Sequence, residues 1–226
     1  MRTRLLLIPW LCVSPLAAQS TIQVPQDHPA IQAAIVAASP GDTVLVAPGT
    51  YLEQIDFLGK AITVTSSGGA KVTTIDSQGH AQWLDQPIGP VVRMKQGEGA
   101  SSVLEGFTIT GSVDPTGFLA GFTGIWCDGL SPTVRKCVVT GNKGAMGAGV
   151  FGNAVLQDCT IKGNTTLTTG DGGGLHGQPT LIDCKVTGNH STGRGGGLYA
   201  TGPCTVTGTV FDANIAGNGV DRKSVV

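Results

Sequence analysis

The sequence has 226 residues, of which 35 are glycine, 13% are charged and 40% are hydrophobic, and its formal net charge is −1. Soluble proteins carry ~25% charged residues and ~7% glycine, so this composition argues against a helical bundle or coiled coil. The hydrophobic content argues against disorder. The balanced charge gives no electrostatic basis for binding nucleic acid or an acidic membrane surface. The composition indicates a β-rich domain with many turns.

Residues 1–18 have the layout of a secretory signal peptide. Two arginines precede the apolar run 5–13, and the small residues Ala17 and Ala18 follow as a cleavage site. The run is shorter than the ~20 apolar residues of a transmembrane helix, so no membrane span is expected. We predict a secreted protein, extracellular or on the cell surface. A buried N-terminal strand is the alternative, which the two prolines in this segment disfavour.

Residues 19–41 are predicted to form an N-terminal cap that contains a helix. Pro29 suits the first position of that helix. Four apolar residues then recur at helical spacing and give the helix one apolar face: Ile31, Ala34, Ile35 and Ala38. A strand follows from Val44. A helix here would cover the end of a stacked β structure and prevent association through its edge.

The rest of the chain is organised by a repeat. Five segments of the form Cys-x-Ile-x-Gly-Asn, or a variant of it, start at intervals of 30, 22, 25 and 25 residues, at Phe107, Cys137, Cys159, Cys184 and Thr209. A glycine-rich series runs in step with them at 147–150, 172–175 and 195–198. A period in the twenties indicates a solenoid. The apolar residues alternate as in strands, without the leucine spacing of leucine-rich repeats.

This repeat resembles the pectate-lyase-like superfamily of right-handed parallel β-helix proteins, over about residues 40–220. The run 31–51 also resembles the opening of pectinesterase. The resemblance implies an all-β, right-handed parallel β-helix over residues 42–220, with three strands in each coil of about 22–25 residues. It leaves the activity open, because enzymes and non-enzymes share this architecture. Residues 221–226 match a translated sequencing adapter, so we expect a truncated reading frame whose missing part carries some of the function.

Two ladders of side chains are predicted in the solenoid. Stacked thiols come from Cys137, Cys159 and Cys184; five cysteines remain after signal cleavage, and this odd number argues against a disulfide framework, although a bridge between coils is the alternative. Stacked amides come from Asn142, Asn164, Asn189 and Asn214. Two of these asparagines also match glycosylation acceptor motifs, at 164–166 and 189–191.

The aspartates at another repeat position have two interpretations. Asp158 and Asp183 share a repeat position with Gly106, Lys136 and Gly208. Glycine and aspartate are the residues selected by a tight turn with a left-handed backbone, which is the interpretation we favour. Stacked carboxylates that hold calcium are the alternative. No other metal or cofactor is expected, since no Cys or His pair has zinc-binding spacing.

The first strand of each coil carries the candidate site. Apolar residues point inward at Ile125, Val150, Leu175 and Leu198, so the following residues point outward as a column: Trp126, Phe151, His176 and Tyr199. A second outward column carries hydrogen-bonding groups: Asp128, Asn153, Gln178 and Thr201. Rings beside polar groups suit a sugar, whose C–H face stacks while its hydroxyls need partners. A purely structural ladder, or one covered by the loop 111–123, is the alternative.

A catalytic set is not complete in this sequence. Titratable candidates near the first-strand face are Asp128, Asp171, His176 and Arg194, without a close acidic cluster. The resemblance implies either clustered calcium ligands with a basic arginine, or a carboxylate pair. We therefore expect a protein that binds polysaccharide. The alternatives are a polysaccharide lyase or glycoside hydrolase completed by missing coils, and a non-catalytic, adhesin-like stalk.

Overall fold

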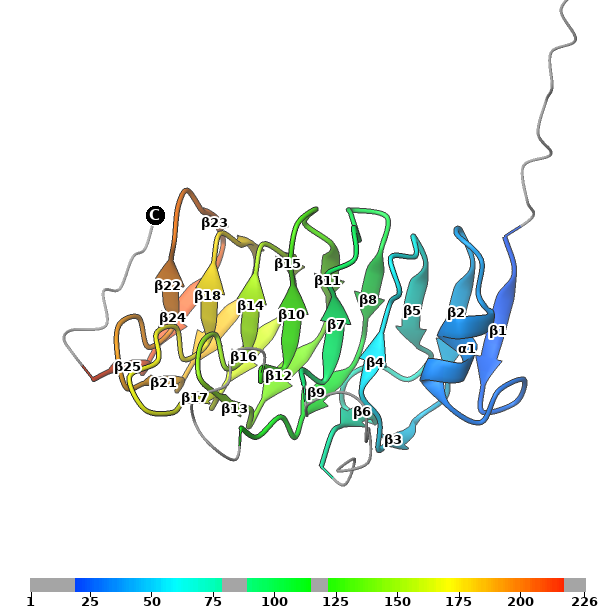
Figure 1. The fold of residues 1–226 in the computed structure, drawn as a ribbon, viewed down its shortest axis with the longest axis horizontal. Helices are drawn as coiled ribbons and strands as arrows, with labels where there is room; N and C mark the ends of the chain where they lie inside the picture. The colour runs from blue at the N-terminus through cyan, green and yellow to red at the C-terminus, as the bar shows by residue number, and fades with distance from the viewer. Residues whose placement is uncertain (1–18, 79–88, 115–121, 218–226) are drawn as a thin grey trace, which may run out of the picture.

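The computed structural model describes residues 19–78, 89–114 and 122–217, which wind into a column of stacked coils (Figure 1). The predicted leader 1–18 and the segment 221–226 lie outside the described residues. All paired strands are parallel and form four sheets, here named A to D.

Sheet A contains, in spatial order, β1 (Thr21–Val24), β2 (Thr43–Val46), β5 (Thr63–Ser66), β8 (Val103–Glu105), β11 (Thr133–Arg135), β15 (Val155–Gln157), β19 (Thr180–Ile182) and β23 (Thr205–Thr207). Sheet B contains β3 (Gly49–Tyr51), β6 (Thr73–Asp76), β9 (Thr108–Thr110), β12 (Val138–Thr140), β16 (Thr160–Lys162), β20 (Lys185–Thr187) and β24 (Val210–Asp212). Sheet C contains β4 (Ile55–Asp56), β7 (Val92–Met94), β10 (Ile125–Cys127), β14 (Val150–Gly152), β18 (Leu175–Gly177) and β22 (Leu198–Ala200). Sheet D contains β13 (Lys143–Gly144), β17 (Thr165–Thr166), β21 (His190–Ser191) and β25 (Ile215–Ala216).

The chain visits the sheets in a fixed order, C then A then B, and each later coil adds a short strand of sheet D. Parallel strands joined this way form a right-handed parallel β-helix, which confirms the predicted fold class. The prediction of three strands per coil is wrong for the later coils. An asparagine follows each third strand by two residues, and its carbonyl accepts from the backbone of the next coil, where the following two residues also pair.

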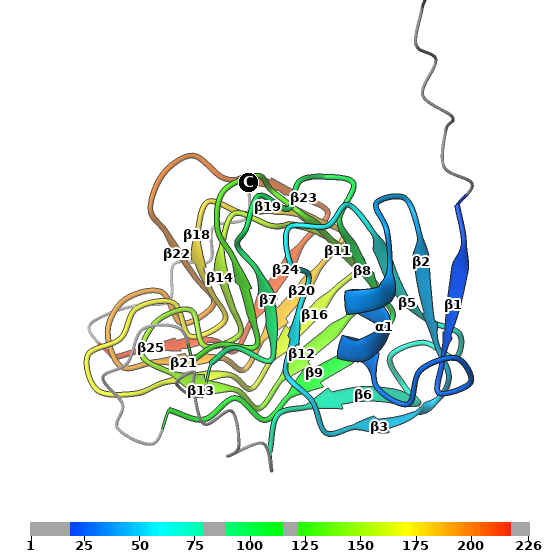
Figure 2. The ribbon, with the colours of Figure 1, turned by 45° about the vertical axis from the view of Figure 1, so that its right-hand side comes forward.

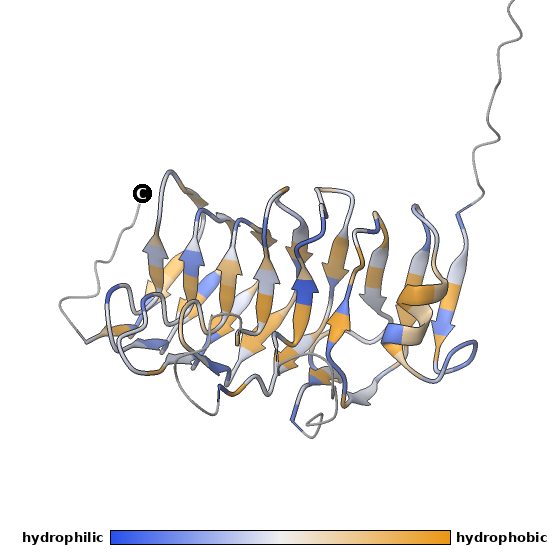
Figure 3. Cartoon of the chain, in the orientation of Figure 1, coloured by the Kyte–Doolittle hydropathy of each residue, from blue (hydrophilic) through white to orange (hydrophobic). Residues whose placement is uncertain are grey.

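The core is a stack of alternate residues from sheets A, B and C. Val134, Leu156 and Leu181 of sheet A are fully buried, and so are Val139, Ile161 and Val186 of sheet B. Figure 3 shows apolar residues recurring in the strands of successive coils. Short strands of β-branched residues form here because each apolar side chain packs on its equivalent in the next coil.

The corner between sheets A and B is a tight turn with a left-handed residue. The backbone φ angle lies between 52° and 79° at all five equivalent positions, which are Gly106, Lys136, Asp158, Asp183 and Gly208. This geometry supports the turn interpretation of Asp158 and Asp183 over the calcium interpretation. The described residues contain no group of three or more His, Cys, Asp or Glu side chains arranged to hold a metal ion.

The asparagine ladder is continuous through the later coils. The Nδ2 of Asn164 donates to Val139 O and to Asn189 Oδ1, both at 3.0 Å, and its Oδ1 accepts from the Nδ2 of Asn142. Asn189 repeats these bonds toward Asn214. Asn164 and Asn189 are fully buried, so neither acceptor motif can be glycosylated while the chain is folded.

The cysteine ladder is also buried. Cys137, Cys159 and Cys184 are free thiols with 1–3% exposure, stacked at the start of three consecutive strands of sheet B. Burial raises the pKa of the Cys137 thiol to about 12. These thiols pack as small apolar groups.

Helix α1 (Ile31–Ala37) comes between β1 and β2 in the chain. It stands in the place that a strand of sheet C takes in later coils, and it contacts β1, β2 and β4 (Figure 2). The prediction of Pro29 at the first helical position is wrong, because the chain turns before the helix begins at Ile31. The carboxylate of Glu53 accepts the N–H groups of the first two helical residues, and Lys60 donates to three carbonyls at the helix end. Strand β1 extends sheet A ahead of the helix, so pairing starts earlier than residue 42.

Candidate functional site

The outer face of sheet C carries a continuous column of rings, here called the aromatic column. The parallel register places Trp126 beside Phe151, Phe151 beside His176, and His176 beside Tyr199. Each ring follows a residue that points into the core, so the two-residue period of the strands directs the rings outward. All four rings are half-buried.

The rings contact one another along the column. Trp126 and Phe151 meet edge to face with centroids 5.7 Å apart, and Phe151 and His176 stack at 5.0 Å with nearly parallel planes. His176 and Tyr199 are 5.2 Å apart and tilted by 40°. Such pairs stabilise neighbouring strands by about 0.5–1.5 kcal/mol each beyond their buried area. The column therefore has a structural role whatever it binds.

A cation lies on the ring at each end of the aromatic column. Lys95 Nζ is 4.2 Å from the ring centroid of Trp126, and Arg194 Cζ is 4.4 Å from that of Tyr199. These cation–π contacts hold the two terminal rings in place. Phe151 and His176 form the centre of the column.

The second set of outward residues, here called the polar column, runs beside the rings and contains Asp128, Asn153, Gln178 and Thr201. Each of them directly follows a strand of sheet C, in register from coil to coil. The backbone N–H of Gln178 donates to Asn153 Oδ1 at 3.1 Å. Asn153 is half-buried, whereas Asp128, Gln178 and Thr201 are exposed, so the side chains of these three residues are available to a ligand.

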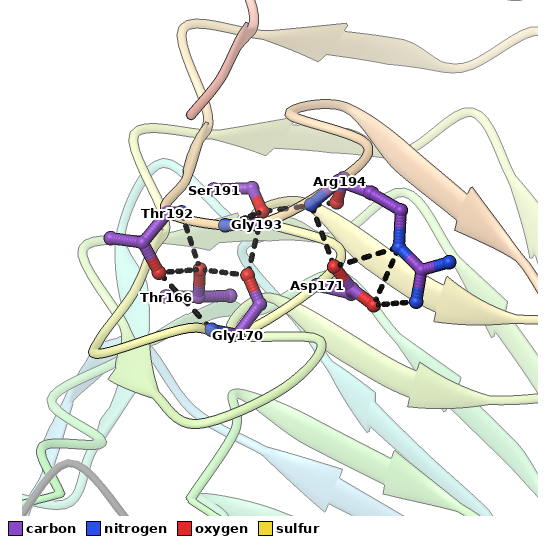
Figure 4. A network of polar contacts seen from close by, with 7 residues as sticks. All are labelled: Thr166, Gly170, Asp171, Ser191, Thr192, Gly193 and Arg194. Atoms are coloured by element: carbon purple, nitrogen blue, oxygen red, sulfur yellow. Dashed lines mark hydrogen bonds and ion pairs between the residues drawn. The ribbon is translucent and has the colours of Figure 1, made fainter. Parts of the chain in front are cut away.

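The loops that precede β18 and β22 border the other side of the aromatic column. Asp171 accepts hydrogen bonds from the backbone N–H of Arg194 at 2.6 Å and from its Nη2 at 2.7 Å (Figure 4). Ser191 Oγ bonds to Gly170 O across the same two loops. A Cβ at Gly172 would lie only 2.8 Å from the Cβ of His176. The loop thus passes close over this imidazole and buries part of it.

The charge states at this border follow from the contacts. Burial raises the pKa of Asp171, but the hydrogen bonds and charge of Arg194 outweigh this effect and leave the pKa below its ordinary value. Burial lowers the pKa of His176, and the charge of Asp171 opposes only part of that shift. At neutral pH, Asp171 is ionised and His176 is neutral. An ionised carboxylate held by an arginine is a poor general acid.

Two ring nitrogens of the aromatic column are hidden from solvent. Trp126 Nε1 and His176 Nδ1 find no hydrogen-bond partner within 19–78, 89–114 and 122–217. A buried polar atom without a partner costs about 1–3 kcal/mol. Both atoms lie beneath the outward surface of the column, so they add to the cost of folding and are not in contact with solvent.

The structure brings most of the predicted site residues together. Trp126, Phe151, His176 and Tyr199 share one column, the polar column lies beside it, and the ion pair of Asp171 and Arg194 borders it. Asp128 belongs to a coil two steps away from His176. The predicted covering loop falls largely on residues 115–121, outside the described part of the chain.

The sequence analysis missed the charged start of this face. Arg93 of β7 pairs with Trp126 in register, and Asp56 of β4 pairs with Arg93, so both extend the outward column. The glycine-rich motif does not precede β4 or β7, so these strands could not be aligned with the later ones from the sequence. The outward position next to a buried valine, in Val92-Arg93-Met94, was the signal that could have found Arg93.

The fold defines the class of the molecule: a right-handed parallel β-helix, with a column of rings on the outer face of one sheet. No protein-family model and no curated protein match the sequence. Pectin methylesterase from Aspergillus niger in its deglycosylated form is similar in structure, with a TM-score of 0.44 and 12% sequence identity over 94% of this chain and 89% of that chain. The same enzyme in a penultimately deglycosylated form gives a TM-score of 0.43, with the same identity and coverage. At this identity the likeness concerns the fold. Within the described residues, no helix has the length and hydropathy to cross a membrane.

Proposed function

We propose that this protein is secreted and binds polysaccharide along the outer face of sheet C. The observation that carries the proposal is the aromatic column flanked by the polar column. Sugar rings stack their C–H faces on aromatic rings, while their hydroxyls bond to amides, carboxylates and hydroxyl groups. Both kinds of group are present here in parallel rows, with Asn153 and Gln178 next to Phe151 and His176.

The rows run along the axis of the solenoid. Neighbouring strands in a sheet are about 4.8 Å apart, so each coil repeats the same ring and the same polar position at that spacing. An extended polysaccharide laid along the axis would meet one coil after another. Because the rings and the polar groups lie in open rows on an outer face, we expect weak contacts at each coil that add up along the chain.

The proposal predicts the effect of removing both terminal rings. The double variant Trp126→Ala/Tyr199→Ala should bind a retained polysaccharide at least about tenfold more weakly than the wild type, which is about 1.4 kcal/mol. Affinity electrophoresis in gels that contain plant or algal polysaccharides, followed by titration calorimetry, measures this difference.

The matched control is the double variant Val155→Ala/Thr180→Ala. These two residues also point outward from the solenoid, but they lie on sheet A, where they are paired with each other. The control should bind as the wild type does. If both double variants are folded and retained as strongly as the wild type, the aromatic column is only a structural ladder and the proposal is wrong.

A further inference from the structure

The charges on the outer face of sheet C cancel. The charged side chains at the surface of the aromatic column, the polar column, their extensions and the bordering loops comprise three acids and three bases: Asp56, Asp128, Asp171, Arg93, Lys95 and Arg194. A surface without net charge has almost no long-range attraction for a charged polymer.

The two arginines are already paired. Arg93 Nη1 is 3.6 Å from Asp56 Oδ2, and Arg194 Nη2 is 2.7 Å from Asp171 Oδ2. An incoming carboxylate or sulfate would have to compete with these partners, and the one at Arg194 makes several hydrogen bonds. Both guanidinium groups are therefore engaged in ion pairs within the protein and are not free to bind a ligand anion.

The remaining cation has an acid at the equivalent position of the next coil. Lys95 lies on the ring of Trp126, and its coil neighbour in the polar column is Asp128. A polymer with an acid on every sugar would place its negative charges beside Asp128 and Asp171 as well as beside the cations. Like charges in proximity cost free energy, so such a polymer gains nothing on balance.

Neutral hydrogen-bonding groups fill the centre of the face. Asn153 and Gln178 offer amides, and the neutral rings of Phe151 and His176 lie beside them. We infer that the ligand is an uncharged polysaccharide, recognised through its hydroxyls and C–H faces. This inference rests on the proposed function and specifies its ligand class.

Matched pairs of polymers test the inference, because each pair keeps one backbone and changes only its charge. The pairs are polygalacturonate with its fully methyl-esterified form, and carboxymethylcellulose with hydroxyethylcellulose. The wild type should bind the uncharged member of at least one pair about tenfold more tightly than its charged partner. That binding should change less than about twofold between low salt and about 0.5 M salt, since charge screening acts only on ionic contacts.

Two variants with the same change of charge sharpen the test. Asp56→Asn releases Arg93 from its ion pair, and it should raise affinity for the charged polymers in low salt. Asp212→Asn makes the same substitution on β24 of sheet B and should have no such effect. Tighter, salt-sensitive binding of the charged members by the wild type would overturn the inference and leave the proposed function standing. Failure of every polymer to bind would overturn the proposed function itself.

Discussion

Ile161→Asp is expected to lower the free energy of unfolding by about 4 kcal/mol or more, enough to unfold most of the protein. Ile161 is completely buried: its accessible fraction is 0%, and its in-register neighbours are Val139 and Val186. A carboxylate there would lose its hydration without gaining a cation or a hydrogen-bond donor. Urea denaturation followed by circular dichroism measures the loss.

The control for this substitution lies on the same strand. Lys162 is exposed on the outer face of sheet B, so Lys162→Asp introduces the same side chain into water. It should change stability by only about 0.5 kcal/mol. Nearly equal stability of the two variants would show that the register assigned to β16 is wrong.

Asn164→Asp is expected to cost about 3 kcal/mol or more at neutral pH, although the two side chains have almost the same shape. Two donors of Asn164 reach Val139 O and Asn189 Oδ1. The substitution replaces these donors by an acceptor oxygen with negative charge, so acceptors would face acceptors in a fully buried site. Thermal and urea unfolding at several pH values measure the effect.

The pH dependence of this variant has a definite sign. The site disfavours the ionised carboxyl, so the pKa of the introduced group is higher in the folded chain than in the unfolded chain. The protonated form can donate one hydrogen bond, and the loss of stability should therefore shrink as the pH falls from neutral toward about 4. Asn153→Asp is the control, because Asn153 accepts from Gln178 N through Oδ1 and a carboxylate can still do so. A deficit that is independent of pH, or equal in both variants, would contradict the ladder.

The repeat made the fold predictable. Inward and outward residues alternate along each strand, and the inward ones recur from coil to coil, as at Cys159 and Cys184 and at Leu175 and Leu198. This recurrence was enough to set the register of the strands. Sheet D was not predictable from such alternation, because its strands have two residues each. They directly follow the asparagine ladder, whose backbone carbonyls accept their first hydrogen bonds.

The site was predictable only in part, for a similar reason. The aromatic column follows from the glycine-rich repeat before β14, β18 and β22. The ion pair of Asp171 and Arg194 depends on how two loops lie against each other, and the sequence analysis gave these residues as separate catalytic candidates. Arg93 and Asp56 stand in coils without the motif, so the balance of charge on this face became visible only in the structure.

The most direct test of the account is the indole N–H signal of Trp126 during a polysaccharide titration, observed by proton–nitrogen correlation NMR and assigned with Trp126→Phe. The ring of Trp126 is half-buried at one end of the aromatic column, so a sugar that stacks on this ring should shift its indole signal. The account predicts a saturable shift that follows the binding isotherm of an uncharged polysaccharide. An indole signal that stays in place while the protein is saturated with polysaccharide would contradict binding at the aromatic column.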